Sequence, residues 1–520
     1  MDQSIAPIKA EFWGRPSTLA DSQAEAPEAV SKPKVSRRQQ KRDRKGQAAN
    51  RLCHSFMKDG TCAFGDGCRF SHDVDRVIEI KPRALPGRCP YSSLETCPFG
   101  PTCGRYDFSK AAGTLRQLQD DSGHAHLAKI WDVVAHQQGG ESNADLMSHQ
   151  REKPRLDLRG KLYLAPLTTV GNLPFRRICK GWGADVTCGE MAMCTNLLQG
   201  QSSEWALLKR DSSEDLFGVQ ICGGYMDTMT RCAQLLEDQI DVNFVDVNCG
   251  CPIDLVCNKG GGSALLQKPE RLEGVMRGVS TRLSCPVTLK LRTGVSQSHD
   301  VAHTLLPRIS SWGVAAATLH GRSRHQRYSG KANWDYIGRC AEAAPQLQLV
   351  GNGDIFSFTD YEEHIAKTPQ LASVMIARGA LMKPWLFTEI KERRHWDISS
   401  GERLDMLKRF CSFGLVHWGS DSRGVENTRR FLLEWLSYLY RYIPIALLDV
   451  VPQQLNWRAP AYVARNDLEV LMSSEHPSDW IKISEMLLGP APEGMRFTPK
   501  HKSSAYPPTT APRDAEQENG

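Results

Sequence analysis

The stretch LFGVQICGGYMDTMTRCAQLLEDQIDVNFVDVNCG, residues 216–250, decides the fold. Two short apolar runs, LFGVQICG (216–223) and NFVDVNCG (243–250), flank a longer segment whose composition is typical of a helix. A strand, a helix and a second strand in this order form the unit from which parallel sheets are built. The architecture then depends on how often the unit repeats.

Six further runs of the same kind occur between residues 161 and 380. They are KLYLAPL (161–167), ADVTCGEM (184–191), VTLKLRTG (287–294), AAATLHGR (315–322), QLVGNGDI (348–355) and SVMIARGA (373–380). Eight β/α units predict an α/β fold of the TIM (β/α)8 barrel type, whereas a doubly wound open sheet gives no reason for eight. Because the polar or glycine-containing part of each run lies at its C-terminal end, we expect the chemistry at that face of the barrel.

The composition and hydrophobic pattern of the remaining chain predict further regions. They are a disordered basic arm (1–50), CCCH-type zinc fingers (51–108), a connector (109–158), the barrel (159–395), an all-helical domain (396–505) and a disordered tail (506–520). The helical domain rests on LDMLKRFCSFGLVHW, RRFLLEWLSYLYRYI and DWIKISEMLL, in which apolar residues recur at helical spacing. In the connector, HLAKIWDVVAH predicts one amphipathic helix.

The composition, with 40% hydrophobic and 24% charged residues among 520, is that of a soluble globular protein. No run approaches the roughly 18 apolar residues of a membrane helix, and the first residues lack the apolar centre of a secretory signal. We therefore expect no membrane contact and a place in the cytoplasm, the nucleus or both. The basic segment KPKVSRRQQKRDRK (32–45) is typical of a tail that attracts phosphate or directs nuclear import, and equally of a solvated linker.

The segment RLCHSFMKDGTCAFGDGCRFSH (51–72) has the spacing of a structural zinc site. Its C-x8-C-x5-C-x3-H pattern supplies three thiolates and one imidazole, which complete a closed tetrahedral shell, from Cys53, Cys62, Cys68 and His72. Fingers of this type resemble those of RNA-binding proteins, in which aromatic side chains stack on unpaired bases. Phe56, Phe64 and Phe70 suit that role, or else form the miniature core of the finger.

A second finger follows in CPYSSLETCPFGPTCGRYD (89–107). Three zinc ligands are expected from it, Cys89, Cys97 and Cys103. Asp107 stands where the histidine of the first finger would be, so the fourth ligand stays open, with His124 and His126 as further candidates.

The segment VDVNCGCPIDLVCNKGGGSALL (245–266) contains the pattern N-x-G-C-P, with Asn248 and Cys251, and a run of three glycines that can open and close over a substrate. With it the chain resembles the tRNA-dihydrouridine synthase family, over the whole barrel and the helical domain. The resemblance implies an FMN-binding barrel that reduces uridine to 5,6-dihydrouridine in tRNA.

The resemblance also implies flavin contacts at the other strand ends. They are Ala165, Pro166 and Leu167 after the first strand, Gln220, Lys290 and His320 on the third, fifth and sixth, and Asn352, Gly353, Asp354, Ala377, Arg378 and Gly379 at a phosphate site after the last two. Each match is weak alone, because a strand lysine is often an ion pair and a lone histidine is usually structural. Six such motifs together, in the order and on the strands that the family has, are not expected in a protein outside the family.

The chemistry that the resemblance implies needs an acid. Hydride passes from N5 of reduced FMN to C6 of uracil, and the carbanion at C5 must then be protonated from the opposite side of the base. Cys251 is the candidate, since a thiol of pKa near 8.5 is mostly protonated at neutral pH. Cys249 and Cys257 compete on proximity, but only Cys251 fits the family position before the proline. Lys290 would offset charge at the flavin, and Asn248 with His320 would orient the base or ring.

Basic residues follow the sixth strand in HGRSRHQRYSGKANW (320–334). A cluster at the active-site rim suits tRNA phosphates around a base that is flipped out toward the flavin, so we assign Arg322 and Arg324, with Asn248, to substrate binding. A loop that is basic only for solubility is the alternative. Basic residues of the helical domain, such as Arg429, face either an anionic partner or solvent.

The fingers, together with NTRRFLLEWLSYLYRYIP, PQQLNWRAP and DWIKISEMLLGPAPEG, resemble the eukaryotic type of synthase that modifies position 47 of the tRNA variable loop. This type implies NADPH or NADH as the electron donor, and the chain shows no Rossmann fingerprint. We expect a monomer that acts on tRNA, with messenger RNA as an open second substrate.

Two alternatives remain at this point. One is an FMN-barrel oxidoreductase that acts on a free small molecule, against which the fingers and the rim arginines argue. The other is a non-catalytic RNA-binding zinc-finger protein, against which Cys251, Lys290 and His320 argue.

Overall fold

The computed structural model of the chain describes residues 9, 62, 64–68, 70–72, 153–460 and 462–500. They belong to two units, of which one contains the first zinc finger and the other the barrel with the helical region. The predicted basic arm apart from Lys9, the second finger, the connector helix and the C-terminal tail lie outside the described residues.

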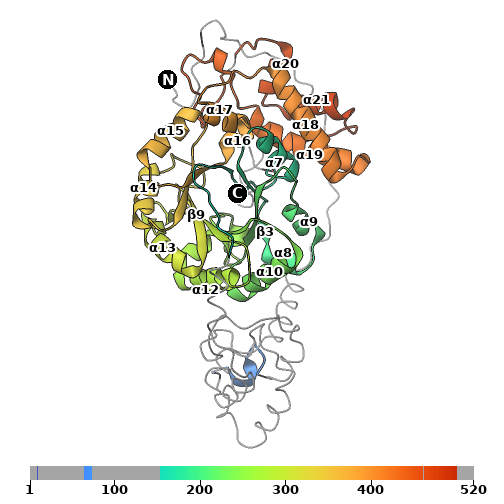
Figure 1. Cartoon of the computed structure of the whole chain (residues 1–520). Helices are drawn as coiled ribbons and strands as arrows, with labels where there is room; N and C mark the ends of the chain where they lie inside the picture. The colour runs from blue at the N-terminus through green and yellow to red at the C-terminus, as the bar shows by residue number, and fades with distance from the viewer. Residues whose placement is uncertain are drawn as a thin grey trace, which may run out of the picture. The chain divides into compact units, whose positions relative to one another are not determined.

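Eight parallel strands of the described chain close into a barrel, which Figure 1 shows end-on. They are β1 (Leu162–Leu164), β2 (Val186–Cys188), β4 (Leu216–Cys222), β5 (Phe244–Cys249), β6 (Val287–Arg292), β9 (Val314–His320), β10 (Gln348–Asn352) and β11 (Ser373–Ile376). Each strand pairs with the next, and the ring closes because β1 pairs with both β11 and β2, and β2 with β4. The predicted TIM barrel is therefore confirmed, with all eight predicted strands present.

The observed strands end earlier than the predicted runs. β6 stops at Arg292 and β11 at Ile376, two and four residues before the runs end. After β10, Gly353 and Asp354 have φ of +140° and +49°, which no strand residue adopts. The polar and glycine-rich ends thus leave the sheet and form the loops of one barrel face, which we call the mouth.

Helices surround the strands on the outside of the barrel (Figure 1). The longer ones are α7 (Leu173–Gly181), α10 (Met226–Gln239), α12 (Pro269–Ser280), α13 (Ala302–Ile309), α14 (Trp334–Ala343), α15 (Phe358–Lys367) and α17 (Leu386–Glu392). Most of them bury an apolar stripe; α10, for example, buries Met229, Cys232 and Leu236 completely or nearly so, whereas α15 has no buried residue. Burying one such side chain stabilises the fold by about 1.5–3 kcal/mol. The short helices α11 (Asp254–Cys257) and α16 (Arg378–Met382) lie in loops at the mouth.

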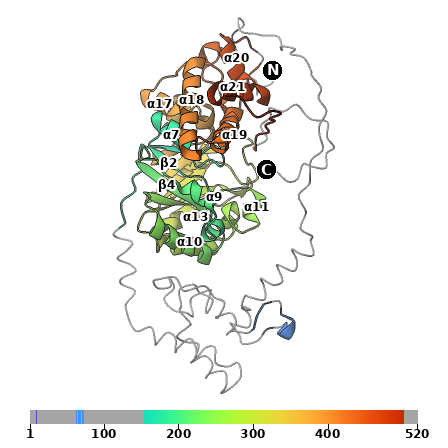
Figure 2. The same cartoon turned by 90° about the vertical axis from the view of Figure 1, so that its right-hand side faces the viewer.

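The helical region contains α18 (Ser400–Trp418), α19 (Ser422–Leu439), α20 (Asp467–Ser473) and α21 (Pro477–Leu488). Ser399 and Glu402 form a capping box that starts α18. The Trp435 indole of α19 donates a hydrogen bond to the Leu381 carbonyl (2.9 Å) and packs on Phe175 of α7, which fixes the region to one side of the barrel (Figures 1 and 2).

None of the helices in the described part of the chain is long and apolar enough to span a membrane.

Candidate active site at the barrel mouth

The register of β5 and β6 places a ladder of polar side chains inside the barrel. Asp246 pairs with Thr288 and Asn248 with Lys290. Because successive residues of a strand point to opposite faces, the alternate residues of β6 face the barrel interior, and the last of them is Arg292 at the mouth. Cys249 belongs to the other face and is fully buried, as expected for a small core residue.

A relay of hydrogen bonds runs from the barrel interior to Cys251. Asp246 accepts from Thr288 Oγ1 (2.6 Å) and from Gln220 Nε2 (2.7 Å). The Gln220 carbonyl then accepts from Asn248 Nδ2 (2.9 Å), and Asn248 Oδ1 accepts from the backbone N–H of Cys251 (2.9 Å). A carboxylate only accepts, so Asp246 fixes the orientation of both amides. Asn248 therefore positions the loop that carries Cys251.

The backbone around Cys251 is closely packed. Its carbonyl accepts from Ser263 Oγ (2.9 Å), and also from the Cys257 thiol (3.5 Å). Gly262 has φ of +56°, and a Cβ there would lie 2.8 Å from the Cys251 carbonyl oxygen. The third glycine of the run is thus required because two segments of the backbone approach each other closely there.

Burial raises the pKa of the Cys251 thiol, and Arg292 and Arg324 oppose this only in part. The thiol is therefore protonated at neutral pH, as a proton donor must be. The competing Cys257 has its thiol turned toward the Cys251 carbonyl and is buried, and Cys249 lies in the core.

Four cations converge on His320 at the end of β9. They are Lys290, Arg292, Arg322 and Arg378, and with burial, the largest cause, they hold the pKa of His320 well below its usual range. His320 is therefore a neutral imidazole. Burial and Arg292 also lower the pKa of Lys290 to about 8, and its ammonium donates to Asn352 Oδ1 (3.4 Å).

Asp354 organises the mouth after β10. Its carboxylate accepts from Arg322 (2.7 Å), from Arg378 (3.1 Å) and from the backbone N–H of Ala332 (2.7 Å). A Cβ on the adjacent Gly353 would lie 2.5 Å from the Ala332 side chain, so only glycine fits. The two arginines are thereby held beside the turn between β10 and α15.

The two arginines assigned to substrate binding differ in their positions. Arg324 lies at the surface, where it forms an ion pair with Asp254 (2.8 Å). Arg322 is 1% exposed and belongs to the buried Asp354 cluster, because its guanidinium turns inward beneath the loop. Arg322 therefore does not share the surface position of the half-buried Arg324.

The remaining predicted contacts lie at the same barrel end. The backbone N–H of Ala165, which follows β1, donates to the Ile376 carbonyl of β11 (2.9 Å), and the Leu167 carbonyl accepts from Gly171 (2.7 Å). Pro166 lies between them, and Ala377 precedes α16, whose first residues are Arg378 and Gly379.

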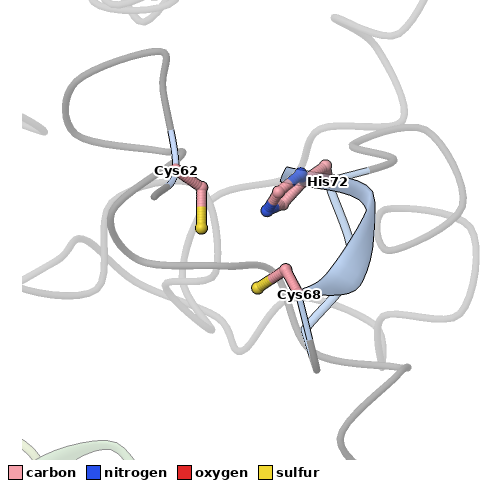
Figure 3. A group of neighbouring side chains, drawn as sticks. All are labelled: Cys62, Cys68 and His72. Atoms are coloured by element: carbon pink, nitrogen blue, oxygen red, sulfur yellow. The ribbon is translucent and has the colours of Figure 1, made fainter. Parts of the chain in front are cut away.

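The first zinc finger forms a compact ligand cluster (Figure 3). The ligand atoms of Cys62, Cys68 and His72 lie within 4.8 Å of one another, as three corners of a tetrahedral zinc site require. A tight turn, η2 (Gly65–Gly67), brings the two cysteines together, with the N–H of Cys68 donating to Gly65 (3.1 Å). The other predicted ligands Cys53, Cys89, Cys97 and Cys103 lie outside the described residues.

Two family models match the chain. Residues 163–413 match "Dihydrouridine synthase (Dus)" and residues 49–75 match "DUS3L CCCH zinc finger domain". Proteins named tRNA-dihydrouridine(47) synthase [NAD(P)(+)]-like are 45% identical in Oryza sativa subsp. japonica, 49% in Mus musculus and 48% in Homo sapiens, each over 88% of this chain and 86%, 83% and 81% of their own length. The chain belongs to the dihydrouridine synthase family. The solved structure "Crystal structure of TcOYE with pHBA" matches 46% of this chain and 91% of its own chain, at 11% identity and with a TM-score of 0.35. A TM-score this low supports no inference.

The mouth of this dihydrouridine synthase fits FMN. The four cations that converge on His320 outnumber the carboxylates that act on them among the described residues, which are Asp246 for Lys290 and Asp354 for Arg378. The Nε of Arg322 is buried and has no hydrogen-bond partner in the described chain. A phosphate-bearing, anionic cofactor would balance this charge and accept from that donor.

Sequence reasoning missed four polar residues of the mouth: Asp246, Thr288, Arg292 and Tyr328. The first three carry a readable signal, since they stand at alternate positions of two strands that end in predicted site residues. Tyr328 carries none. It lies in an irregular loop, 57% exposed, with its ring centroid 5.1 Å from the Arg378 guanidinium and 5.9 Å from that of Arg292.

Proposed function

We propose that this chain reduces uridine to 5,6-dihydrouridine in tRNA, at position 47 of the variable loop, with NADPH or NADH as the electron donor to FMN. The observation that carries the proposal is Cys251, held as a protonated thiol at the end of the Asp246 relay beside a cation cluster that fits FMN. The names of the relatives and their coverage of most of the chain support the substrate.

When bound, reduced FMN supplies a hydride to C6 of the uracil. Its addition leaves an electron pair at C5, and Cys251 donates the thiol proton there, so that one C–H bond forms and the S–H bond breaks. The thiolate takes its next proton from water. Asn248 holds the Cys251 loop in place, and Lys290 offsets negative charge at the flavin.

The tRNA contacts lie outside this centre. Arg324 at the rim contacts phosphate, and the finger and the helical region hold the rest of the tRNA. We further propose that the protein acts as a monomer and that messenger RNA is a second substrate.

The test is the acceptor of the electrons. Under anaerobic conditions, flavin reduced with NADPH should be reoxidised by tRNA that lacks dihydrouridine and not by free uridine, which is followed from the flavin absorbance. Rapid reoxidation by free uridine or another small acceptor would instead favour a small-molecule oxidoreductase.

A further inference from the structure

The loop between β1 and α7 contains a backbone turn that residues other than glycine rarely adopt. Thr169 has φ of +75°, and the N–H of Val170 donates to the Thr168 carbonyl two residues earlier (3.0 Å). This pattern is that of a γ-turn, and the form with positive φ is the rare and strained one. Among the four non-glycine residues of the described chain with positive φ, Thr169 is the β-branched one, for which such a backbone is least tolerated.

Two buried side chains hold the polar groups of this turn. The N–H of Thr169 donates to Oε2 of Glu190 (2.5 Å), which follows β2, and its carbonyl accepts from Nδ2 of Asn172 (3.1 Å). Asn172 is itself fixed, because its Oδ1 accepts from the N–H of Phe175 and caps α7 (3.1 Å). Without Glu190, the buried N–H of Thr169 would have no acceptor among the described residues. A strained turn persists only where its surroundings over-determine it in this way.

The turn lies at the mouth, next to the residues expected to line the flavin, Ala165, Pro166 and Leu167. The chain doubles back there. The N–H of Gly171 donates to the Leu167 carbonyl (2.7 Å), and a Cβ on Gly171 would lie 2.5 Å from that oxygen. The Thr169 turn closes this narrow loop and so sets how the residues before it face the mouth. Backbone strain of this kind is concentrated at ligand sites, where it is part of the mechanism.

We propose that Glu190 is a positioning residue for the flavin, which holds the γ-turn at Thr169 and thereby fixes the cofactor-lining residues 165–167. Glu190 acts through the turn and needs no contact with the cofactor. The carboxyl keeps the chain in a shape that Thr169 alone would not adopt, and that shape is the one that fits FMN. This inference rests on the FMN site of the proposed function.

The first experiment removes the acceptor and then the need for it. In Glu190→Ala the N–H of Thr169 loses its partner, so the loop should leave the strained turn and the dissociation constant for FMN should rise about tenfold. Thr169→Gly added to this variant should restore the affinity to within about threefold of the wild type, because glycine adopts positive φ without strain. Water can then reach the N–H through the space that the Glu190 side chain leaves. Fluorescence titration of each apoprotein with FMN measures these affinities.

A conservative variant and a matched control complete the first experiment. Burial raises the pKa of Glu190, so the folded protein already disfavours its charged form, and an uncharged acceptor can replace it. Glu190→Gln should therefore bind FMN within about threefold of the wild type. The control is Glu204→Ala, since Glu204 also accepts from a backbone N–H, that of Met193 in β3 (Ala192–Met193). Thr169→Gly should not reverse any loss of FMN affinity in Glu204→Ala.

Equal affinity of Glu190→Ala and the wild type for FMN would overturn the proposal. A loss of affinity that Thr169→Gly leaves unchanged would also overturn it, because Glu190 would then act without the turn. Failure of the proposed function is separate, since then wild-type protein forms no dihydrouridine in tRNA, whatever the FMN affinities of the variants.

The second experiment needs no variant, and so applies even where Glu190→Ala fails to fold. If the turn favours FMN binding, FMN must stabilise the turn by the same factor, because coupling between two sites is reciprocal. In hydrogen exchange followed by mass spectrometry, the Thr169 amide should exchange about tenfold more slowly in the holoenzyme than in the apoprotein. Amides of α21, outside the barrel, should exchange at the same rate in both. An equal rate at Thr169 in the two forms contradicts the proposal.

Discussion

Arg292 at the barrel mouth and Arg429 in the helical region are both buried arginines, but their donors are used differently. Arg429 is 1% exposed, and all three of its nitrogens are bonded, to Glu426, to Ser484 Oγ and to the carbonyls of Gly489 and Pro490. Arg292 bonds through two nitrogens and keeps the third unused among the described residues.

The difference separates structural from functional charge. A guanidinium whose donors are all satisfied within the protein has nothing left to offer a ligand, and its loss leaves buried carbonyls unpaired. One with an unused donor costs stability, and a ligand that accepts from that donor offsets the cost.

The largest effect is expected at the mouth, for Cys251→Ala. Without the proton at C5, reoxidation of reduced flavin by tRNA should slow by about 10²–10⁴-fold, while reduction by NADPH stays as in the wild type. Rapid-mixing absorbance measurements of the two half-reactions separate these steps. An unchanged tRNA-dependent step would remove Cys251 from the mechanism.

In the helical region, Arg429→Gln should act on stability and not on chemistry. Loss of its hydrogen bonds should lower the free energy of unfolding by about 3 kcal/mol, measured by denaturant titration. Arg430→Gln, one residue along and exposed, is the matched control and should change it by less than about 0.5 kcal/mol. Equal effects of the two variants would mean that the Arg429 contacts contribute little.

Gly353→Ala tests the phosphate side of the mouth. The added Cβ would clash with Ala332, and φ of +140° disfavours alanine, so the turn that would hold the phosphate must shift. We expect FMN to bind about tenfold more weakly, equivalent to about 1.4 kcal/mol. Fluorescence titration of the apoprotein with FMN measures this, and unaltered affinity would place the phosphate elsewhere.

The smallest effect concerns pH. Burial lowers the pKa of Lys290 to about 8, so the ammonium is mostly charged at pH 7 and mostly neutral at pH 9. As the positive charge is lost with rising pH, FMN should bind less tightly, by less than about tenfold. Lys290→Met should bind FMN more weakly than the wild type at pH 7, and its dissociation constant for FMN should not change between pH 7 and pH 9. A parallel pH dependence of FMN binding in both proteins would exclude Lys290 as the source of that dependence.

The sequence predicted the barrel because strand and helix periodicity repeat eight times, and it placed Cys251 and Lys290 because motifs mark the strand ends. It did not predict that Arg322 is buried while Arg324 is half-buried in an ion pair at the surface, since two neighbours in an irregular loop carry no periodic pattern. Both alternatives predicted for Arg429, contact with an anionic partner and exposure to solvent, were wrong. The side chain is buried against α21, and such burial depends on long-range packing. The unused donor of Arg292 could be found only from its three-dimensional contacts.

The most direct test of the central claim is the nucleoside content of tRNA treated with the purified holoenzyme and NADPH. Mass spectrometry of tRNA that began without dihydrouridine should show uridine converted to a product two mass units heavier at position 47, with wild-type protein and not with Cys251→Ala. Absence of that product with wild-type protein, while NADPH is consumed regardless of tRNA, would contradict the account.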